Sequence, residues 1–266
     1  GLYRLCRRFF GTAGTMTAVA FFLFFPYGVF ASRSFQPDPL MVALILWALE
    51  ALCHWEAHPT LGGALLAGLL AGAAIFVKQV SVFPLGLAML FFVLGARGFR
   101  GAVRSVQLWL VAVLSLLPVL IYNFWGYFVQ GFLVQQYQDR FYWREIISPA
   151  FYVRWIRKIE QVFGLPLAIG ALLGTTGLRE KKYRLLWMGY FAGYLCYGWV
   201  LPHHIGTHDY YHLILFPLLA VGLAGPALAQ GERELALEAR VAELERLVQA
   251  LMSQQQSQGA QIEEVK

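Results

Sequence analysis

Apolar residues along this chain come in long runs separated by short polar breaks. The runs at 18–31 and 62–77 carry no charged side chain, so no face of a helix formed from them suits water. About eight runs of roughly 16 to 20 residues are long enough for a helix to cross the hydrocarbon layer of a membrane. Their approximate limits are 13–31, 39–55, 62–78, 82–97, 105–123, 161–177, 185–201 and 211–229. The pattern predicts an all-α polytopic transmembrane helical bundle.

Two local patterns refine this prediction. The sixth run is interrupted by glycines and by Pro166, so we expect a kinked or tilted helix there. In the third run, Gly68 and Gly72 lie four residues apart among Leu and Ala, a pattern that permits close helix packing.

Composition supports a membrane protein. Hydrophobic residues make up 59% of the 266 residues, charged residues only 14%, and the mean hydropathy is +0.57, which excludes an ordinary soluble domain. The 21 Lys and Arg exceed the 15 Asp and Glu, but the excess is spread over short loops, which indicates topology and no nucleic-acid partner. Three cysteines in different segments argue against a disulfide framework.

Basic residues predict the orientation of the bundle, since Lys and Arg gather in cytoplasmic loops. Three clusters precede the first run, follow the fourth and follow the sixth, and with eight spans all three lie on one side. They are Arg4, Arg7 and Arg8; Arg97, Arg100 and Arg104; and Arg179, Lys181, Lys182 and Arg184. The opposite, outer side then receives the segments 32–38, 78–81, 123–160 and 202–210.

The outer segment 32–38 contains Arg33, Gln36 and Asp38 in a short polar connection. Asp38-Pro39 has a plain structural explanation, because Asp is a favoured N-cap and Pro a favoured first helical residue. A carboxylate at the edge of a cavity, with Arg33 and Gln36 within reach, could also hold a metal, a cationic sugar or an acceptor hydroxyl. The sequence leaves both interpretations open.

Lys78 and the histidine-rich run are further candidates on the outer side. Lys78 either reaches interfacial water along its stem or offers a point charge to a lipid phosphate. Four-residue spacing would align three histidines if 204–212 were helical, so a divalent metal is an open alternative. Hydrogen bonding to sugar or phosphate is the preferred interpretation. The residues involved are His204, His208, His212, Asp209 and Tyr211.

Three other features have less specific interpretations. Glu50, inside the second run, is the best hint of transport, although local hydrogen bonding near His54 and Glu56 explains it more simply.

Ser148-Pro149 opens a basic amphipathic helix, with Phe151, Trp155, Ile159 and Val162 on one stripe. This helix lies either at the membrane interface or on the bundle. The tail 230–266 carries heptad-like spacing from Leu237 to Leu251, which favours either a homodimeric coiled coil or a solvated single helix.

Motifs of soluble active sites are absent, including Gly-rich phosphate loops, G-x-S-x-G and H-E-x-x-H. Three stretches instead resemble glycosyltransferase family 39, the GT-C superfamily of protein mannosyltransferases and aminoarabinose transferases. They are SRSFQPDPLM at 32–41, AGAAIFVKQVSVFPLGLAML around Lys78, and HDYYHLILFPLLAVGLA from His208. The resemblance covers roughly residues 1–229, which we take as a transmembrane glycosyltransferase-like domain.

The resemblance implies an enzyme of a prokaryotic plasma membrane that inverts the anomeric carbon. Its donor would be a polyprenyl-phosphate sugar, and its acceptor a protein, lipid or glycan. By carry-over, Asp38 matches an acidic residue of the family's second outer loop and Lys78 matches the lysine near the lipid phosphate. His208, Asp209 and Tyr211 match the polar entry of the late span.

One departure from the family concerns its principal catalytic carboxylate, which lies in an earlier outer loop. The chain begins at Gly1 without an initiator Met, and we therefore expect an N-terminally truncated fragment that lacks this base and is inactive alone. A multi-pass secondary transporter and a noncatalytic membrane scaffold are the alternatives.

Overall fold

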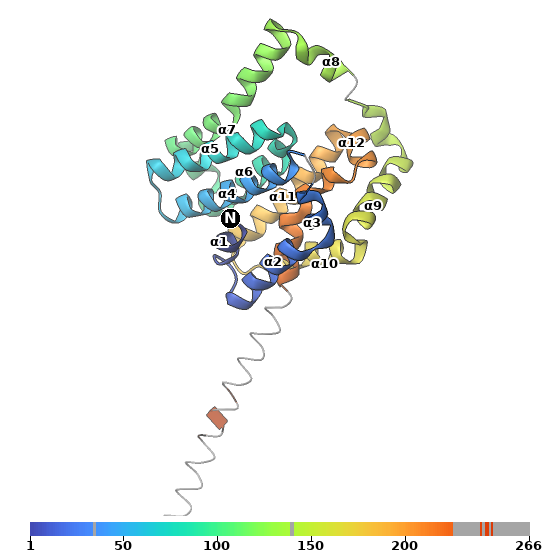
Figure 1. Ribbon diagram of the computed structural model, residues 1–266. Coiled ribbons are helices and arrows are strands. Elements are labelled where there is room, and N and C mark those ends of the chain that lie inside the picture. The colour runs from blue at the N-terminus through green and yellow to red at the C-terminus, as the bar shows by residue number, and fades with distance from the viewer. Residues whose placement is uncertain (34–35, 139–140, 226–239, 241–242, 245, 247–266) are drawn as a thin grey trace, which may run out of the picture. The chain divides into compact units, whose positions relative to one another are not determined.

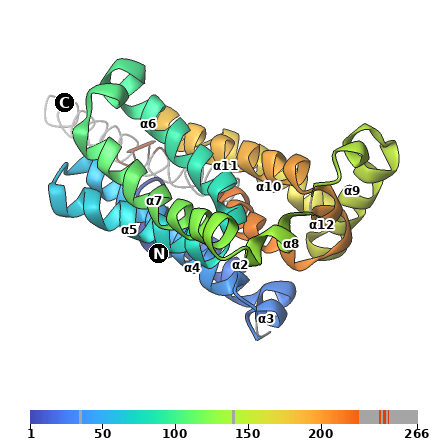
Figure 2. The same cartoon turned by 90° about the horizontal axis from the view of Figure 1, so that it is seen from above.

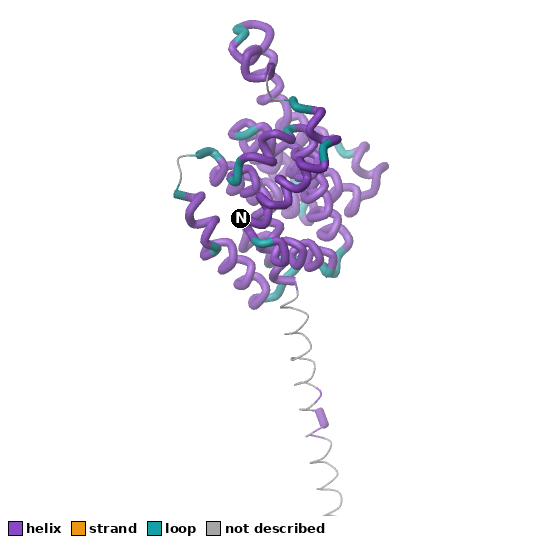
Figure 3. The backbone as a smooth tube through the Cα atoms, turned by 90° about the vertical axis from the view of Figure 1, so that its right-hand side faces the viewer, coloured by secondary structure: helices purple, strands orange, loops and turns teal. Residues whose placement is uncertain are grey.

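The computed structural model describes residues 1–33, 36–138, 141–225, 240, 243–244 and 246, and the described part contains helices and no strand. The elements are α1 (Leu2–Cys6), α2 (Thr12–Phe24), α3 (Pro26–Ser32), α4 (Asp38–Ala57), α5 (Leu61–Val77), η1 (Gln79–Ser81), α6 (Val82–Arg104), α7 (Val106–Phe124), η2 (Trp125–Val129), α8 (Phe132–Gln138), η3 (Trp143–Ile147), α9 (Pro149–Phe163), α10 (Leu165–Thr176), α11 (Lys181–Val200), α12 (Pro202–Thr207) and η4 (Tyr210–Leu215). The predicted all-α bundle is confirmed. Figure 3 shows helices joined by short loops.

The core of the bundle consists of α4, α5, α6, α7 and α11, which lie side by side (Figures 1 and 2). Gly72 of α5 lies so close to α7 that a Cβ atom there would overlap the carbonyl of Leu114, which confirms the close approach predicted from Gly68 and Gly72. A second such contact was not predicted. A Cβ atom on Gly189 or Gly193 of α11 would overlap backbone atoms of α6.

Three helical segments are long and apolar enough to cross a membrane, namely Asp38–Ala57, Gln79–Arg104 and Val106–Val129. Two bent pairs, α2 with α3 and α9 with α10, raise this number to five among the described residues. Each of the eight predicted runs contains helix, but α5, with 17 residues, is at the lower limit of length for a span, and α10, with 12, is too short to cross a membrane alone. The apolar helices indicate an integral membrane protein, and among the described residues fewer helices are long enough to be full spans than the hydropathy predicts.

The two bends have different local causes. The first predicted run divides at Phe25, where α2 and α3 meet at 56°, because Pro26 supplies no N–H and disfavours helical backbone before it. The sixth divides at Gly164, whose φ of 82° lies in the left-handed region, and α9 meets α10 at 88°. Glycine adopts this φ without steric cost, so the expected kink is a right-angle turn.

The chain separates into two compact units, Gly1–Pro226 and Ala227–Lys266. In the second unit only Arg240, Glu243, Leu244 and Arg246 are described, and all four are helical. Most of the predicted coiled coil, including the positions from Val248 onward, lies outside the described residues. The homodimer remains a prediction.

Candidate functional site

Helix α4 separates two ends of the bundle that differ in chemistry. The helix has 20 residues and so is about 30 Å long. Near its C-terminal end it contacts one member of each predicted basic cluster: Arg8 reaches Glu50 at 2.7 Å, the Arg97 guanidinium lies 4.4 Å from the Trp55 ring centroid, and Lys182 reaches Glu56 at 3.1 Å. We call this the basic end. The gathering of the three clusters, predicted from the sequence, is confirmed.

These contacts also settle the surroundings of Glu50. Its side chain is 6% exposed and lies 2.7 Å from Arg8 and 3.4 Å from Arg4. A buried carboxylate that is paired in this way has a structural explanation. Among the described residues, no observation therefore supports the transport interpretation that Glu50 suggested.

The opposite end of α4 begins with an ion pair. The Nζ atom of Lys78 lies 2.5 Å from Oδ1 of Asp38, and the two side chains are 15% and 2% exposed. Burial lowers the pKa of Lys78, and the charge and hydrogen bond of Asp38 offset only part of this effect. Lys78 thus does not extend its ammonium into interfacial water. Its charge is held inside the protein by a carboxylate 40 residues earlier.

The structure corrects the expectation that Asp38 is the N-cap of α4. Pro37 is the N-cap, Asp38 is the first helical residue, and no side chain caps this helix. The carboxylate is therefore not used to satisfy helical N–H groups. One of its oxygens binds Lys78, and the other, Oδ2, is buried without a hydrogen-bond partner among the described residues.

Aromatic rings from the late part of the chain cover Lys78. Its Nζ lies 4.4 Å from the ring centroid of Tyr211 and 5.0 Å from that of Tyr210, distances typical of cation–π contacts. His204 contacts the ring of Tyr211, and His208 stacks on Tyr210. Lys78, Asp38, Tyr210, Tyr211, His204 and His208 form what we call the lysine site.

All four predicted outer segments meet at this end. Asp38 comes from the first segment and Lys78 from the second, whereas Tyr210 closes the fourth. The third segment joins through Asn123, whose side chain accepts a 2.9 Å hydrogen bond from Gln79. We call this the site end of the bundle.

Other candidate residues lie at the site end without entering the lysine site. Arg33 and Gln36 are exposed, and neither has a side-chain hydrogen bond or ion pair with a described residue. Asp209 is exposed and caps η4 by accepting the N–H of Tyr210 at 2.9 Å. The structure therefore does not bring these three side chains to Lys78.

Sequence reasoning missed two tyrosines near the lysine site. Tyr197 of α11 is fully buried beside Tyr211, with ring centroids 6.0 Å apart, and its hydroxyl has no hydrogen-bond partner among the described residues. Tyr27 of α3 lies within electrostatic reach of Asp209 and Asp38. A recurring spacing of Tyr along one face of α11, at 183, 190, 194 and 197, was the available signal for the first.

The three histidines His204, His208 and His212 do not share one helical face. Helix α12 ends at Thr207, so 204–212 is not one helix, and His212 is buried in a different network. Its Nδ1 lies 2.7 Å from the Tyr194 hydroxyl and its Nε2 lies 3.0 Å from the carbonyl of Ile205. Because that carbonyl only accepts, Nε2 carries the proton, and the neutral ring accepts from Tyr194. His212 is structural.

Metal ligands do not gather at the site end. Within the part of the chain that the structure describes, no three His, Cys, Asp or Glu side chains are placed to hold one metal ion. A requirement for a divalent metal remains an untested alternative.

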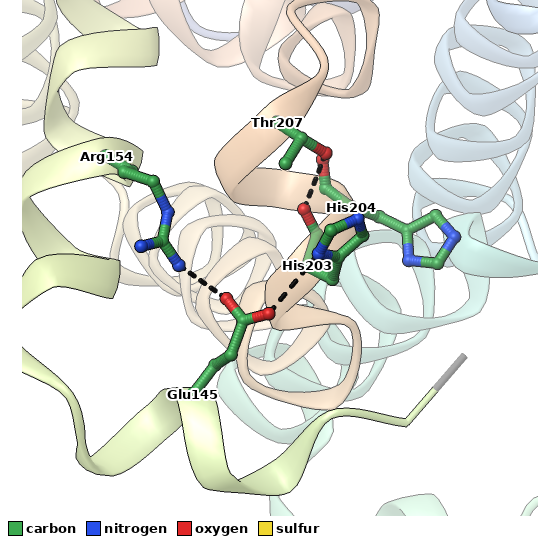
Figure 4. Close-up of polar contacts among 5 residues, drawn as sticks. All are labelled: Glu145, Arg154, His203, His204 and Thr207. Atoms are coloured by element: carbon green, nitrogen blue, oxygen red, sulfur yellow. Dashed lines mark hydrogen bonds and ion pairs between the residues drawn. The ribbon is translucent and has the colours of Figure 1, made fainter. Parts of the chain in front are cut away.

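Figure 4 shows a second polar network at the site end, which the sequence did not predict. Glu145 of η3 binds Arg154 of α9 at 2.5 Å and His203 of α12 at 3.3 Å. Thr207 donates to the carbonyl of His203 at 2.7 Å. These contacts tie η3, α9 and α12 together beside the lysine site. This network depends on tertiary contacts between residues up to 58 positions apart. A local sequence pattern therefore could not predict it.

An apolar groove runs along α4 from its first turn. It has a volume of about 460 Å³ and is lined by one face of α4, including Pro39, Val42 and Leu46, and by residues of α1, α2, α3 and η4. Pro39 follows Asp38 directly in the sequence, although Asp38 and Lys78 do not themselves line the groove. It can accept an extended apolar chain whose polar head lies at the site end.

Comparison with known proteins covers the N-terminal part of this arrangement. Residues 1–125 match the family model described as dolichyl-phosphate-mannose-protein mannosyltransferase. No curated protein and no solved structure gives a significant match. The matched part includes Asp38, Lys78 and two of the three stretches that resemble the GT-C superfamily. The third stretch, which begins at His208, and the basic-end residue Lys182 lie outside it. Over these residues the chain is similar to membrane glycosyltransferases of the GT-C type, the class that includes the protein mannosyltransferases.

Proposed function

We propose that the protein takes part in transfer of a sugar from a polyprenyl-phosphate carrier to an acceptor at the site end, with inversion at the anomeric carbon. The observation that carries this proposal is the buried Asp38–Lys78 pair on a helix whose first turns, from Pro39 onward, also line an apolar groove. The groove suits the polyprenyl chain, and the ammonium suits the phosphate. The family match over residues 1–125 points to the same class of reaction.

Lys78 is placed to bind the phosphate of the donor. An ammonium has three N–H donors, and Asp38 takes one of them. The two others can bind phosphate oxygens. When the bond between the anomeric carbon and the phosphate oxygen breaks, both electrons leave with the polyprenyl phosphate, and Lys78 stabilises that negative charge.

Asp38 is proposed as a supporting carboxylate. Its buried Oδ2 has an unused capacity to accept a hydrogen bond, which a hydroxyl of the sugar or of the acceptor could satisfy. His204, His208 and Tyr211 form the wall around Lys78 and would contact the donor's head. The proton of the acceptor hydroxyl goes to a general base as the new glycosidic bond forms. In the family that the chain resembles, that base is a carboxylate of an earlier outer loop, and the acceptor is a protein, lipid or glycan.

The exposed candidates have a more peripheral place in this proposal. Arg33, Gln36 and Asp209 lie at the rim of the site end and would meet the acceptor as it approaches. The membrane concerned would be a prokaryotic plasma membrane, with the site end on its outer face. The transporter alternative gains no support, because Glu50 is neutralised by arginines.

Binding of a polyprenyl phosphate to the protein in lipid nanodiscs tests the proposal without requiring catalysis. Lys78→Gln removes the charge and should weaken binding by about 10- to 100-fold, since a hydrogen bond to a charged group contributes about 1.5–3 kcal/mol. A polyprenol without phosphate should bind both proteins equally weakly.

Lys182→Gln is the matched control. Lys182 also pairs with a carboxylate, Glu56, but at the basic end. It should leave the affinity unchanged. Equal affinities of the wild type and Lys78→Gln for the phosphate would refute the proposed role of Lys78 and favour a noncatalytic scaffold.

A further inference from the structure

Helix α9 lies across the site end of the bundle. It meets α10 at 88°, and Figures 1 and 2 show it beside α12, crossing the direction of α4, α5 and α6. If α4 and α6 cross the membrane, a helix that crosses their direction at their end lies along the membrane surface. The orientation alone does not say what α9 contacts.

One side of α9 is held firmly by the bundle. Phe151 and Trp155 are 0% and 5% exposed, and the indole N–H of Trp155 donates to the Tyr194 hydroxyl at 2.6 Å. Glu145 of η3, the short helix before α9, also forms ion pairs with Arg154 and His203 (Figure 4). The segment 141–163 is thus fixed to the bundle and is not a free loop, which supports the connector interpretation of its buried stripe.

The other side exposes a set of large apolar residues. Ile147 is 83% exposed, Ile156 49% and Val153 48%, although each lies in a segment that is otherwise fixed. Three aromatic side chains add to them. The whole set, called the apolar rim, is Phe141, Trp143, Ile147, Tyr152, Val153 and Ile156. Exposed apolar residues of this number in so short a segment indicate a partner surface.

Two arginines beside the apolar rim have no ion-pair partner among the described residues. Glu145 is bound to Arg154 and His203, and a carboxylate oxygen of Glu160 accepts the N–H of Leu165. Arg144 and Arg157, by contrast, form no ion pair with any described residue and are exposed. Trp and Tyr together with Arg beside aliphatic side chains are the residue types that favour the headgroup region of a bilayer.

We infer that the segment 141–157 is immersed in the headgroup region of the leaflet at the site end, with the apolar rim among the upper acyl carbons and with Arg144 and Arg157 on lipid phosphates. Immersion here also sets the depth of the lysine site, because Glu145, Arg154 and His203 join this segment to α12. The inference does not depend on the reaction proposed above.

Spin labels at single cysteines test the immersion. The background would carry Cys196→Ala, since Cys196 is half-buried, while Cys6 and Cys53 are buried. Labels at Ile147→Cys and Ile156→Cys, in the protein reconstituted in phospholipid vesicles, should be several-fold more accessible to oxygen than to a water-soluble nickel chelate. A label at Gln161→Cys, exposed on another face of the same helix, should show the opposite preference.

The charge of Arg157 provides a second arm. Arg157→Glu should move the label at residue 156 toward water, whereas Arg157→Lys should leave its depth unchanged. Preferential access of the nickel chelate to residues 147 and 156 would overturn the inference and leave the apolar rim as a surface for a protein partner.

Discussion

Gly193→Ala is expected to lower the free energy of unfolding by about 3 kcal/mol, at the upper end of the usual cost of overpacking. A Cβ atom at Gly193 would overlap the carbonyl of Phe83 and the Cα of Pro84. These are backbone atoms, so no side chain can rotate away. Relief requires that α6 and α11 separate. Equilibrium unfolding of the protein in detergent measures the loss.

The matched control is Gly86→Ala in α6. A Cβ atom there meets no atom within 4 Å, and replacing glycine by alanine inside a helix stabilises it by roughly 0.5–1 kcal/mol. Gly86→Ala should therefore be neutral or slightly stabilising. If both variants lost equal stability, the close packing of α6 on α11 would be wrong.

Asp38→Ala is the second substitution with a large expected effect. It leaves the ammonium of Lys78 in a buried position without its counter-charge, and removal of one partner from a buried pair costs about 3–5 kcal/mol. The free energy of unfolding should fall by about 3 kcal/mol. Glu56→Ala, which breaks the more exposed pair with Lys182, should cost about 1 kcal/mol or less.

The double variant Asp38→Ala with Lys78→Met separates stability from function. Because it buries no unpaired charge, it should recover most of the stability lost in the single variant. It should still fail to bind polyprenyl phosphate, since the cation is gone. Recovery of binding together with stability would contradict the assignment of Lys78 to the phosphate.

The sequence predicted the gathering of charged residues because sidedness depends on Lys and Arg counts rather than on detailed packing. One residue from each basic cluster therefore lies at the basic end, and Asp38 and Lys78 meet at the other. The count of full spans was less well predicted. Apolar runs mark helices, but Pro26 and Gly164 divide two of them at bends.

Contacts between distant segments could not be predicted. The Glu145–Arg154–His203 network and the burial of His212 depend on how α9, α11 and α12 pack. Four-residue spacing would align His204, His208 and His212 only on one continuous helix, and the helix ends before the spacing is complete. The glycine pair of α11 has the same spacing as Gly68 and Gly72 and could have been found by the same criterion.

The central claim is that the candidate residues face one compartment and the basic clusters face the other. Membrane-impermeant thiol reagents can test this in sealed vesicles of known orientation, with single cysteines in the Cys196→Ala background. Gln36→Cys and His208→Cys, both exposed at the site end, should react from one side, and Arg100→Cys, exposed near the other end of α6, should react only from the opposite side. Reaction of Gln36→Cys and His208→Cys from different sides would contradict the account.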